Sequence, residues 1–385
     1  MVNSVIIREL AQPSNPPGGA GAVSKIYLFA TSSNSNPAEI NTPIKLDKDN
    51  YLSEDYDLAT VVISSIEGIS RNSPRAEIYI IYCKKEGGGS ILDNLTEGLN
   101  QVQLDDSLEA GYILIPEHET LLSAGDKGTL QQRVDSLALE KHWIYFLNAE
   151  SGITVEAVKT EAENYTSKLG HSAMFFGHVI YAGKPTDKEK NEEGLTDTDT
   201  KDRECPLSAI AAAIAVEATV AEGASQAPAG TAYPVVNPGA IPEYVGSDTD
   251  FTTLKNAGVN TLKRIGKFGY CIWGARTLAE EQRFLFINTR QCINTVARQL
   301  EDALTPYLLE PIDPRGRTTS EVVMISTSIM EAAYENNYLT GNSPAEAYQI
   351  IQFPIENSVV KIQIIGNFVN SIEQIEITLV NGEIQ

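Results

Sequence analysis

The chain has 385 residues, of which 42% are hydrophobic, so it is long enough for two or three packed domains and is not an intrinsically disordered protein. Its formal net charge of -22 argues against a general binder of nucleic acid or of an anionic membrane surface, because both partners require clustered Lys and Arg. The first residues lack a positively charged, apolar leader, and no apolar run approaches a membrane span, so we expect a protein made in the cytoplasm.

Residues 1–22 combine a short apolar strand with a linker rich in proline and glycine. Val5, Ile6 and Ile7 favour an extended strand, whereas the linker that follows cannot pack as regular structure. A strand on such a tether predicts an N-terminal arm that pairs with a sheet elsewhere.

Residues 23–204 alternate between strand-like and helix-like segments, which predicts an outer α/β domain with a mixed sheet. The expected strands are rich in β-branched and aromatic residues and span 26–30, 78–82, 112–115, 143–147 and 173–181. The expected helices span 91–103, 128–141 and 153–169. The polar stretch 184–204 predicts an exposed loop or a surface excursion ahead of a second domain.

Residues 205–370 form that second expected domain, of α+β class, and residues 371–385 form a C-terminal arm. The expected helices span 206–221, 278–304 and 319–338, and the expected strands span 347–353 and 359–365. The arm ends in an alternating strand whose apolar face carries Ile375, Ile377 and Leu379. Like the first segment, it is a candidate for adding a strand to a neighbouring sheet.

No motif in the chain indicates catalysis, a metal site or a bound cofactor. Lys184 follows a glycine and a strand, but a phosphate loop needs Ser or Thr next, and Pro185 supplies neither a hydroxyl nor an amide donor. The histidines and cysteines lack the spacing of a zinc or redox site. We therefore expect no enzyme, and an α/β enzyme that binds a ligand at its strand ends is the least favoured alternative.

Three short motifs occur in a fixed order in the last third of the chain. They are GVNTL at 258–262, WGARTL at 273–278 and, after a long helical segment, LEP at 309–311. This order resembles the core signature of contractile tail sheath proteins, in which a GINT turn, a WGARTL strand, a helix with two arginines and FEPN follow one another. Two elements depart from that pattern, because Thr289 stands where the first arginine is usual and LEPI replaces FEPN. The matching residues are Gly258, Asn260, Trp273, Gly274, Arg276, Glu310 and Pro311.

The resemblance implies a structural subunit that polymerises helically around an inner tail tube and contracts to drive that tube through a target cell envelope. Its implied partners are further copies of itself, the inner tail tube protein, and the baseplate and tail terminator proteins, with no direct contact to nucleic acid and no membrane span. Its implied place is a virion tail or an injection-system particle assembled in the host cytoplasm. A baseplate or adaptor component that shares the core domain is the alternative.

Positive charge is concentrated in one segment of this acidic chain. Between residues 255 and 298 there are eight basic residues and two acidic ones. On a helix over 278–304, Arg283, Arg290 and Arg298 share the face opposite Val296 and Leu300. Because a helix of this domain faces the tube in sheath proteins, the resemblance makes these arginines candidates for a tube-facing surface, and a solvated arginine face is the alternative.

Arg276 is expected to have a structural role. It lies in a turn where Gly274 supplies unusual backbone dihedral angles, and a guanidinium there can bond carbonyl oxygens or a carboxylate.

Overall fold

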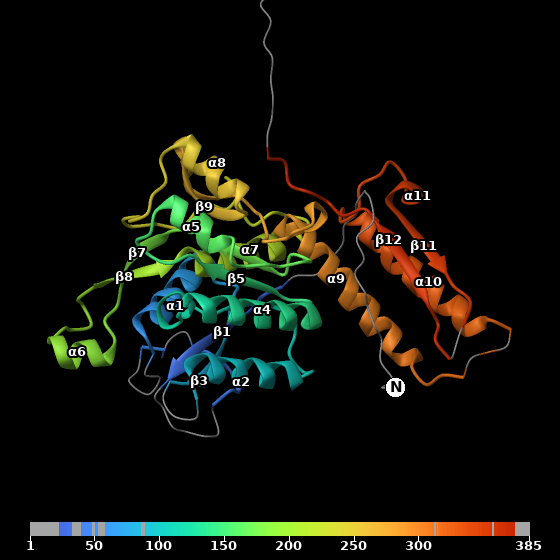
Figure 1. Ribbon diagram of the computed structural model, residues 1–385, viewed down its shortest axis with the longest axis horizontal. Helices are drawn as coiled ribbons and strands as arrows, with labels where there is room; N and C mark the ends of the chain where they lie inside the picture. The colour runs from blue at the N-terminus through green and yellow to red at the C-terminus, as the bar shows by residue number, and fades with distance from the viewer. Residues whose placement is uncertain are drawn as a thin grey trace, which may run out of the picture.

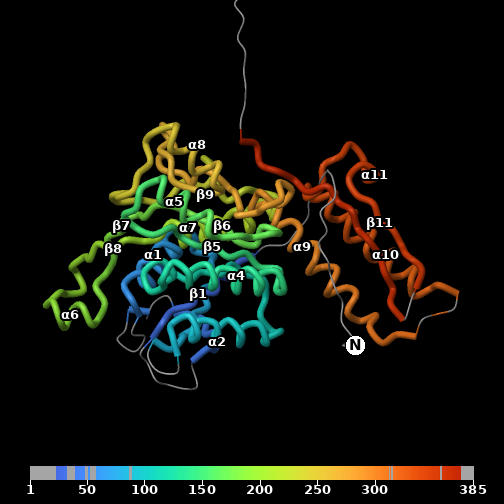
Figure 2. The backbone as a smooth tube through the Cα atoms, viewed as in Figure 1, coloured from blue at the N-terminus to red at the C-terminus, as the bar shows by residue number. Residues whose placement is uncertain are grey.

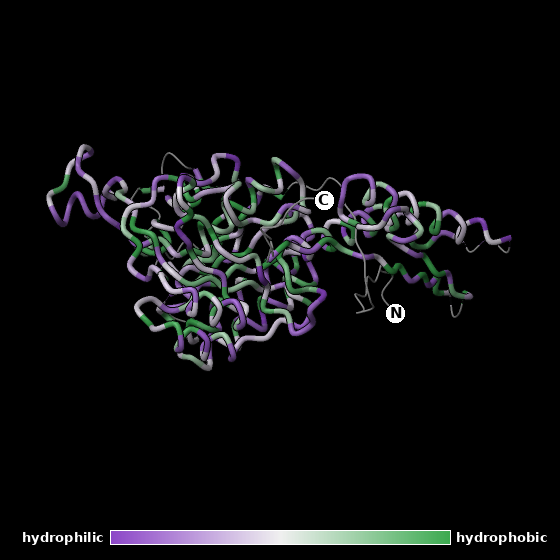
Figure 3. The backbone as a smooth tube through the Cα atoms, turned by 90° about the horizontal axis from the view of Figure 1, so that it is seen from above, coloured by the Kyte–Doolittle hydropathy of each residue, from purple (hydrophilic) through white to green (hydrophobic). Residues whose placement is uncertain are grey.

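A large α/β body and a smaller lobe make up the described part of the chain (Figure 1). The computed structural model describes residues 23–32, 40–47, 51–52, 58–85, 89–311, 313, 315–355 and 358–373. The small lobe also projects from the body when the molecule is seen from above (Figure 3).

The body is built on an eight-stranded sheet with the order β10-β9-β6-β5-β4-β1-β3-β2. Its strands are β1 (Lys25–Ser32), β2 (Pro43–Lys45), β3 (Glu77–Lys84), β4 (Gly111–Leu114), β5 (Ile144–Asn148), β6 (Ser172–Phe175), β9 (Val259–Ile265) and β10 (Gly269–Trp273). The inner strands are parallel and almost wholly buried, as expected where helices cover both faces. The two edge strands, β2 and β10, are antiparallel to their neighbours, so the sheet is mixed, as the sequence predicts.

Two layers of helices cover the sheet. One face packs against α1 (Thr60–Asn72) and α7 (Leu207–Glu222). The opposite face packs against α2 (Ile91–Leu104), α4 (Ala124–Lys141), α5 (Val155–Ala162) and α8 (Asp248–Asn256), while the short α3 (His118–Leu121) follows β4. α7 is alanine-rich and buried along nearly its whole length, because it lies between the sheet and α1.

The polar stretch 184–204 forms a surface protrusion that is bonded to the body. It contains α6 (Asp187–Glu193) and lies between the paired strands β7 (His178–Gly183) and β8 (Lys201–Pro206). The side chain of Arg203 is completely buried and bonds the carboxylates of Glu67 in α1 and Glu189 in α6. This charged pairing anchors the protrusion to the body.

The small lobe begins on α9 (Ile287–Leu304), which runs out of the body (Figure 2). It contains α10 (Arg317–Glu335), α11 (Pro344–Ala347) and the antiparallel pair β11 (Tyr348–Gln352) and β12 (Ile362–Gly366). Its core includes Cys292, Val296 and Leu300 from one face of α9, together with Met330 and Ala333 from α10.

The structure corrects three of the expected elements. The strand expected over 173–181 is two strands, because Gly177 breaks it with a φ of +124°. The helix expected over 153–169 ends at Ala162. The helix expected over 278–304 begins only at Ile287, because the chain before it folds into a turn in which Ile287 N donates to Ala275 O.

The expected division at residues 204 and 205 falls inside β8, and the sheet continues beyond it into β9 and β10. The expected arm at 1–22 lies outside the described residues, and of the expected arm at 371–385 only residues 371–373 are described.

Candidate assembly site

The motif residues of β9 and β10 form a tightly bonded junction. Asn260 is fully buried and donates from Nδ2 to the backbone oxygens of Met174 (3.0 Å) and Arg276 (2.8 Å). Its Oδ1 accepts the backbone N–H of Arg276 at 2.7 Å. Gly274 has a φ of +115°, and a Cβ there would lie 2.7 Å from Asn260 Oδ1. Glycine is therefore required for the turn after β10 to close on Asn260.

Arg276 clamps the last described residue of the chain. Its guanidinium makes a bidentate pair with Glu373, with Nε–Oε1 and Nη2–Oε2 distances of 2.6 and 2.7 Å. It also donates to the backbone oxygen of Lys255 at 3.1 Å, and Lys255 Nζ lies 3.0 Å from Glu373 Oε2. The hydrogen bond from Arg276 lowers the pKa of Glu373 below its usual range. The WGAR motif thus bonds the start of the expected C-terminal arm.

The residues before Glu373 lie along the start of α9. Thr289 Oγ1 donates to the backbone oxygen of Val369, and Ser371 Oγ donates to Asn288 Oδ1 at 3.0 Å. Val369 N also donates to Tyr338 O at 3.2 Å, whereas the side chain of Ile372 is exposed. The C-terminal segment is thus bonded to the body up to the last described residue.

The other motif residues lie apart from this junction or at its margin. Gly258 has a φ of +74° at the start of β9, and Trp273 is 41% exposed at the end of β10. Glu310 and Pro311 are exposed between α9 and α10. The structure therefore brings Asn260, Gly274 and Arg276 together but leaves Glu310 and Pro311 in a different region.

The three candidate tube-facing arginines do not form one exposed surface. Arg290 is completely buried; its Nη1 donates to Leu169 O at 3.0 Å, and its guanidinium stacks over Phe284. Arg298 donates inward to His142 O at 3.0 Å. Arg283 lies before α9 and is exposed. The helical-wheel expectation is corrected for Arg290, because the body covers the face of α9 that periodicity assigned to solvent.

Both edges of the small-lobe hairpin are open among the described residues. β11 and β12 bond each other, and no further described strand joins them. Their side chains are half-buried or exposed. A two-stranded sheet of this kind is marginally stable alone. The unpaired backbone groups along its two edges are suited to accept added strands.

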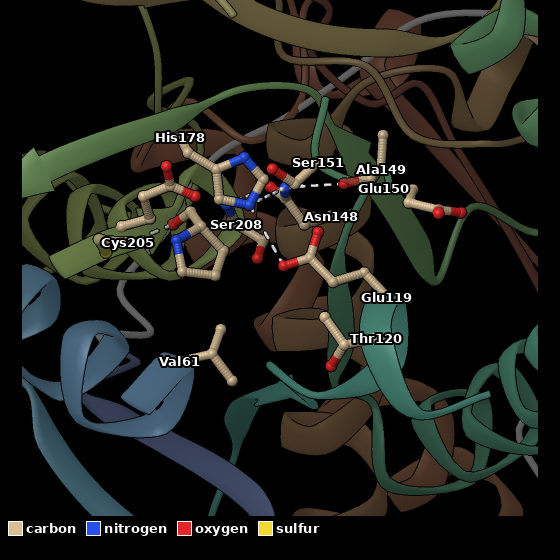
Figure 4. A network of polar contacts seen from close by, with 12 residues as sticks. Val61, Glu119, Thr120, Asn148, Ala149, Glu150, Ser151, His178, Cys205 and Ser208 are labelled. Atoms are coloured by element: carbon tan, nitrogen blue, oxygen red, sulfur yellow. Dashed lines mark hydrogen bonds and ion pairs between the residues drawn. The ribbon is translucent and has the colours of Figure 1, made fainter. Parts of the chain in front are cut away.

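A buried charged cluster in the body was not expected from the sequence. His178 Nε2 lies 3.2 Å from Glu119 Oε1 (Figure 4). His178 Nδ1 lies 3.2 Å from Glu243 Oε2. Burial opposes protonation, but the hydrogen bonds to the two carboxylates raise the pKa of His178 to about 10. Burial likewise opposes ionisation of Glu243, yet the bond from His178 lowers the pKa of Glu243 to about 2. The cluster joins α3, β7 and the segment before α8 as a structural ion network.

Within the described ranges, no group of histidine, cysteine and acidic side chains has the arrangement of a metal site. In the same residues, no helix combines the length and the apolarity needed to cross a bilayer.

The fold has close counterparts among solved structures. A chain from the extracellular contractile injection system PVC, in its contracted sheath complex, superposes with a TM-score of 0.67 at 16% identity and covers 99% of this chain and 97% of its own. The contracted helical sheath of the anti-feeding prophage gives 0.68 at 15% identity, with 99% of both chains covered.

This chain has the contractile sheath fold. A sheath tail protein of Desulfitobacterium hafniense shares it with a TM-score of 0.57 at 8% identity, over 95% of this chain and 100% of that one. No family model and no curated protein matches the amino-acid sequence. The likeness is thus carried by the path of the backbone and not by overall sequence identity.

Proposed function

We propose that this chain is the subunit of a contractile sheath, which polymerises as a helix around an inner tube and shortens to drive that tube through a target cell envelope. The supporting observation is that solved sheath chains match it over nearly their whole length and its own. Contraction needs no chemistry at a catalytic site if the extended lattice is metastable and relaxes into a more tightly packed one.

The partners we propose follow from that role. They are further copies of this chain, an inner tube protein, a baseplate and a terminator at the far end of the tube. We also propose that the chain is assembled in the host cytoplasm and acts as part of a phage tail or an injection particle. Arg283 is exposed and remains a candidate for contact with the tube.

The arms are the proposed means of linking subunits. Strands at Val5–Ile7 and at Ile375–Leu379 would add to the open edges of β11 and β12 in neighbouring copies. Backbone hydrogen bonds tolerate most side chains and allow subunits to rotate without separating. The clamp on Glu373 supports this proposal, because it holds the start of the expected C-terminal arm against the body.

Deleting residues 1–15 tests this linkage. We expect a folded monomer that cannot build tubes, because the donated strand is lost while the body keeps its core. Circular dichroism and thermal melting check the fold, and electron microscopy checks assembly. Tubes of normal length and abundance from the shortened chain would rule out the arm.

A baseplate adaptor is the second candidate function. It is favoured by one observation, the match to a chain in the anti-feeding prophage baseplate, with a TM-score of 0.68 at 17% identity over 100% of this chain and 99% of that one. An adaptor stops at a closed ring, whereas a sheath continues as an open helix.

A further inference from the structure

The β9–β10 hairpin carries part of the positive charge that is concentrated between residues 255 and 298. Arg264 and Lys267 are exposed, and no ion pair joins either of them to a carboxylate among the described residues. The guanidinium of Arg264 lies 6.0 Å from the centre of the Tyr270 ring, and Lys267 Nζ lies 5.2 Å from that of Phe268. Phe268 is 44% exposed. We call Arg264, Lys267, Phe268 and Tyr270 the basic hairpin patch.

Exposed cations beside aromatic rings are well suited to a protein interface. Arginine and aromatic residues are enriched among the side chains that dominate binding energy. The charges of the patch would favour an acidic partner, and the rings would gain from burial against an apolar group at its centre.

An acidic stripe with that composition runs along α10. Glu321, Met324, Ser328, Glu331 and Glu335 follow one another at helical spacings of three and four residues, and all five are exposed. Met324 is 65% exposed near the middle of the stripe. Residues 318–360 contain five glutamates and no lysine or arginine. No ion pair joins Glu321, Glu331 or Glu335 to a basic side chain in the part of the chain that the structure describes.

We propose that the basic hairpin patch of one copy docks on the acidic stripe of α10 in a second copy. The two surfaces lie on different parts of the molecule, β9 on the body and α10 on the small lobe (Figure 1). A contact between two different patches is heterologous, and it propagates as an open helix unless rotation closes a ring. The inference rests on the proposed sheath function and assigns one of its subunit contacts.

Charge reversal and its repair test this contact. The variant Arg264→Glu/Lys267→Glu should raise the protein concentration needed for tube formation by about tenfold or more, because like charges then face each other. The control, Lys168→Glu/Lys188→Glu, makes the same change in net charge at two other exposed lysines and should assemble normally. The fourfold variant that adds Glu331→Lys/Glu335→Lys to the hairpin changes should recover tube formation, since every contact then pairs opposite charges again.

Two results would overturn the proposal: unchanged assembly of the hairpin variant, or no recovery in the fourfold variant. Tube formation by the fourfold variant is measured by pelleting and electron microscopy at low and high salt. Its recovery should be weaker at high salt, because exposed charges are screened.

Cross-linking separates this proposal from the sheath function. A Lys267→Cys chain mixed with a Ser328→Cys chain should give a disulfide-linked pair on mild oxidation, because the proposed contact brings the two new thiols together. The four native cysteines are buried and should not form competing cross-links. Tubes without the cross-linked pair would contradict the docking contact and leave the sheath function standing. The cross-linked pair without tubes would support the contact and contradict the sheath function.

Discussion

At the scale of single residues, Arg276 bonds a residue that is far from it in the sequence. Its bidentate bond reaches Glu373, and its third contact reaches the backbone of Lys255. The pair is partly exposed, with side-chain exposures of 16% for Arg276 and 29% for Glu373. Its contribution to global stability is therefore modest, and its main effect is on the position of the C-terminal segment.

Arg276→Ala should free the C-terminal segment while sparing the fold. We expect a loss of about 1 kcal/mol in unfolding free energy, and faster hydrogen exchange over residues 367–373. Arg75→Ala is the matched control, because it removes an exposed arginine that pairs with Glu217. Equal exchange in both variants would contradict the clamp.

The buried histidine predicts a pH dependence of stability. Because the folded pKa of His178 is about 10 and its ordinary value is 6.5, its contribution is complete below the ordinary value and is lost as pH rises toward the folded one. His178→Gln should lower stability at neutral pH, by about 3 kcal/mol, since two carboxylates lose their buried cation. It should also flatten the decline in melting temperature between about pH 7 and pH 9.

His142→Gln is the control for that experiment. Burial lowers the pKa of His142 to about 4, so it stays neutral across the same range and its loss should not change the slope. If the melting temperature of His178→Gln falls with pH as steeply as that of the wild type, the His178 imidazole is not protonated in the folded protein.

At the scale of elements, the β9–β10 junction depends on one glycine. A Cβ at Gly274 would displace the buried Asn260, and its φ of +115° disfavours any other residue. We expect Gly274→Ala to cost about 2–4 kcal/mol of unfolding free energy. Gly152→Ala should cost about 1 kcal/mol, because that φ is +74° but nothing lies within 4 Å of the added methyl. Equal denaturation midpoints for the two variants would contradict the junction's role.

The sequence predicted elements best where one physical signal dominates. The strands β1, β3, β4 and β5 are runs of β-branched and aromatic residues that are buried on both faces, so composition alone locates them. The start of α9 was misplaced, because the turn that precedes it depends on a contact between Ala275 and Ile287 and not on a local preference.

The burial of Arg290 shows why periodicity alone misassigned part of the exposed face of α9. Periodicity separates apolar from polar positions, but α9 is covered on its polar side as well, where Asn294 donates to Trp143 O. A usable signal was present in the sequence: beside its arginines, that side carries Gln291, Asn294 and Thr295, and no acidic residue lies between residues 290 and 298, which suits buried hydrogen bonding better than solvent. The His178 cluster left no such signal, because its three members are far apart in the chain.

At the scale of the whole molecule, both ends of the described chain lie close to α9. Val23, the first described residue, accepts a hydrogen bond from Thr219 in α7, and the last residues lie along the start of α9. The open hairpin β11–β12 lies on the lobe that α9 carries. This placement supports the proposal that arms beginning at the body add strands to the lobes of neighbouring copies.

Assembly of the purified full-length chain tests the sheath function most directly. Negative-stain electron microscopy at increasing protein concentration should show long hollow tubes with helical striations, because heterologous contacts propagate without closing. Persistent monomers or closed rings at every concentration would contradict the account.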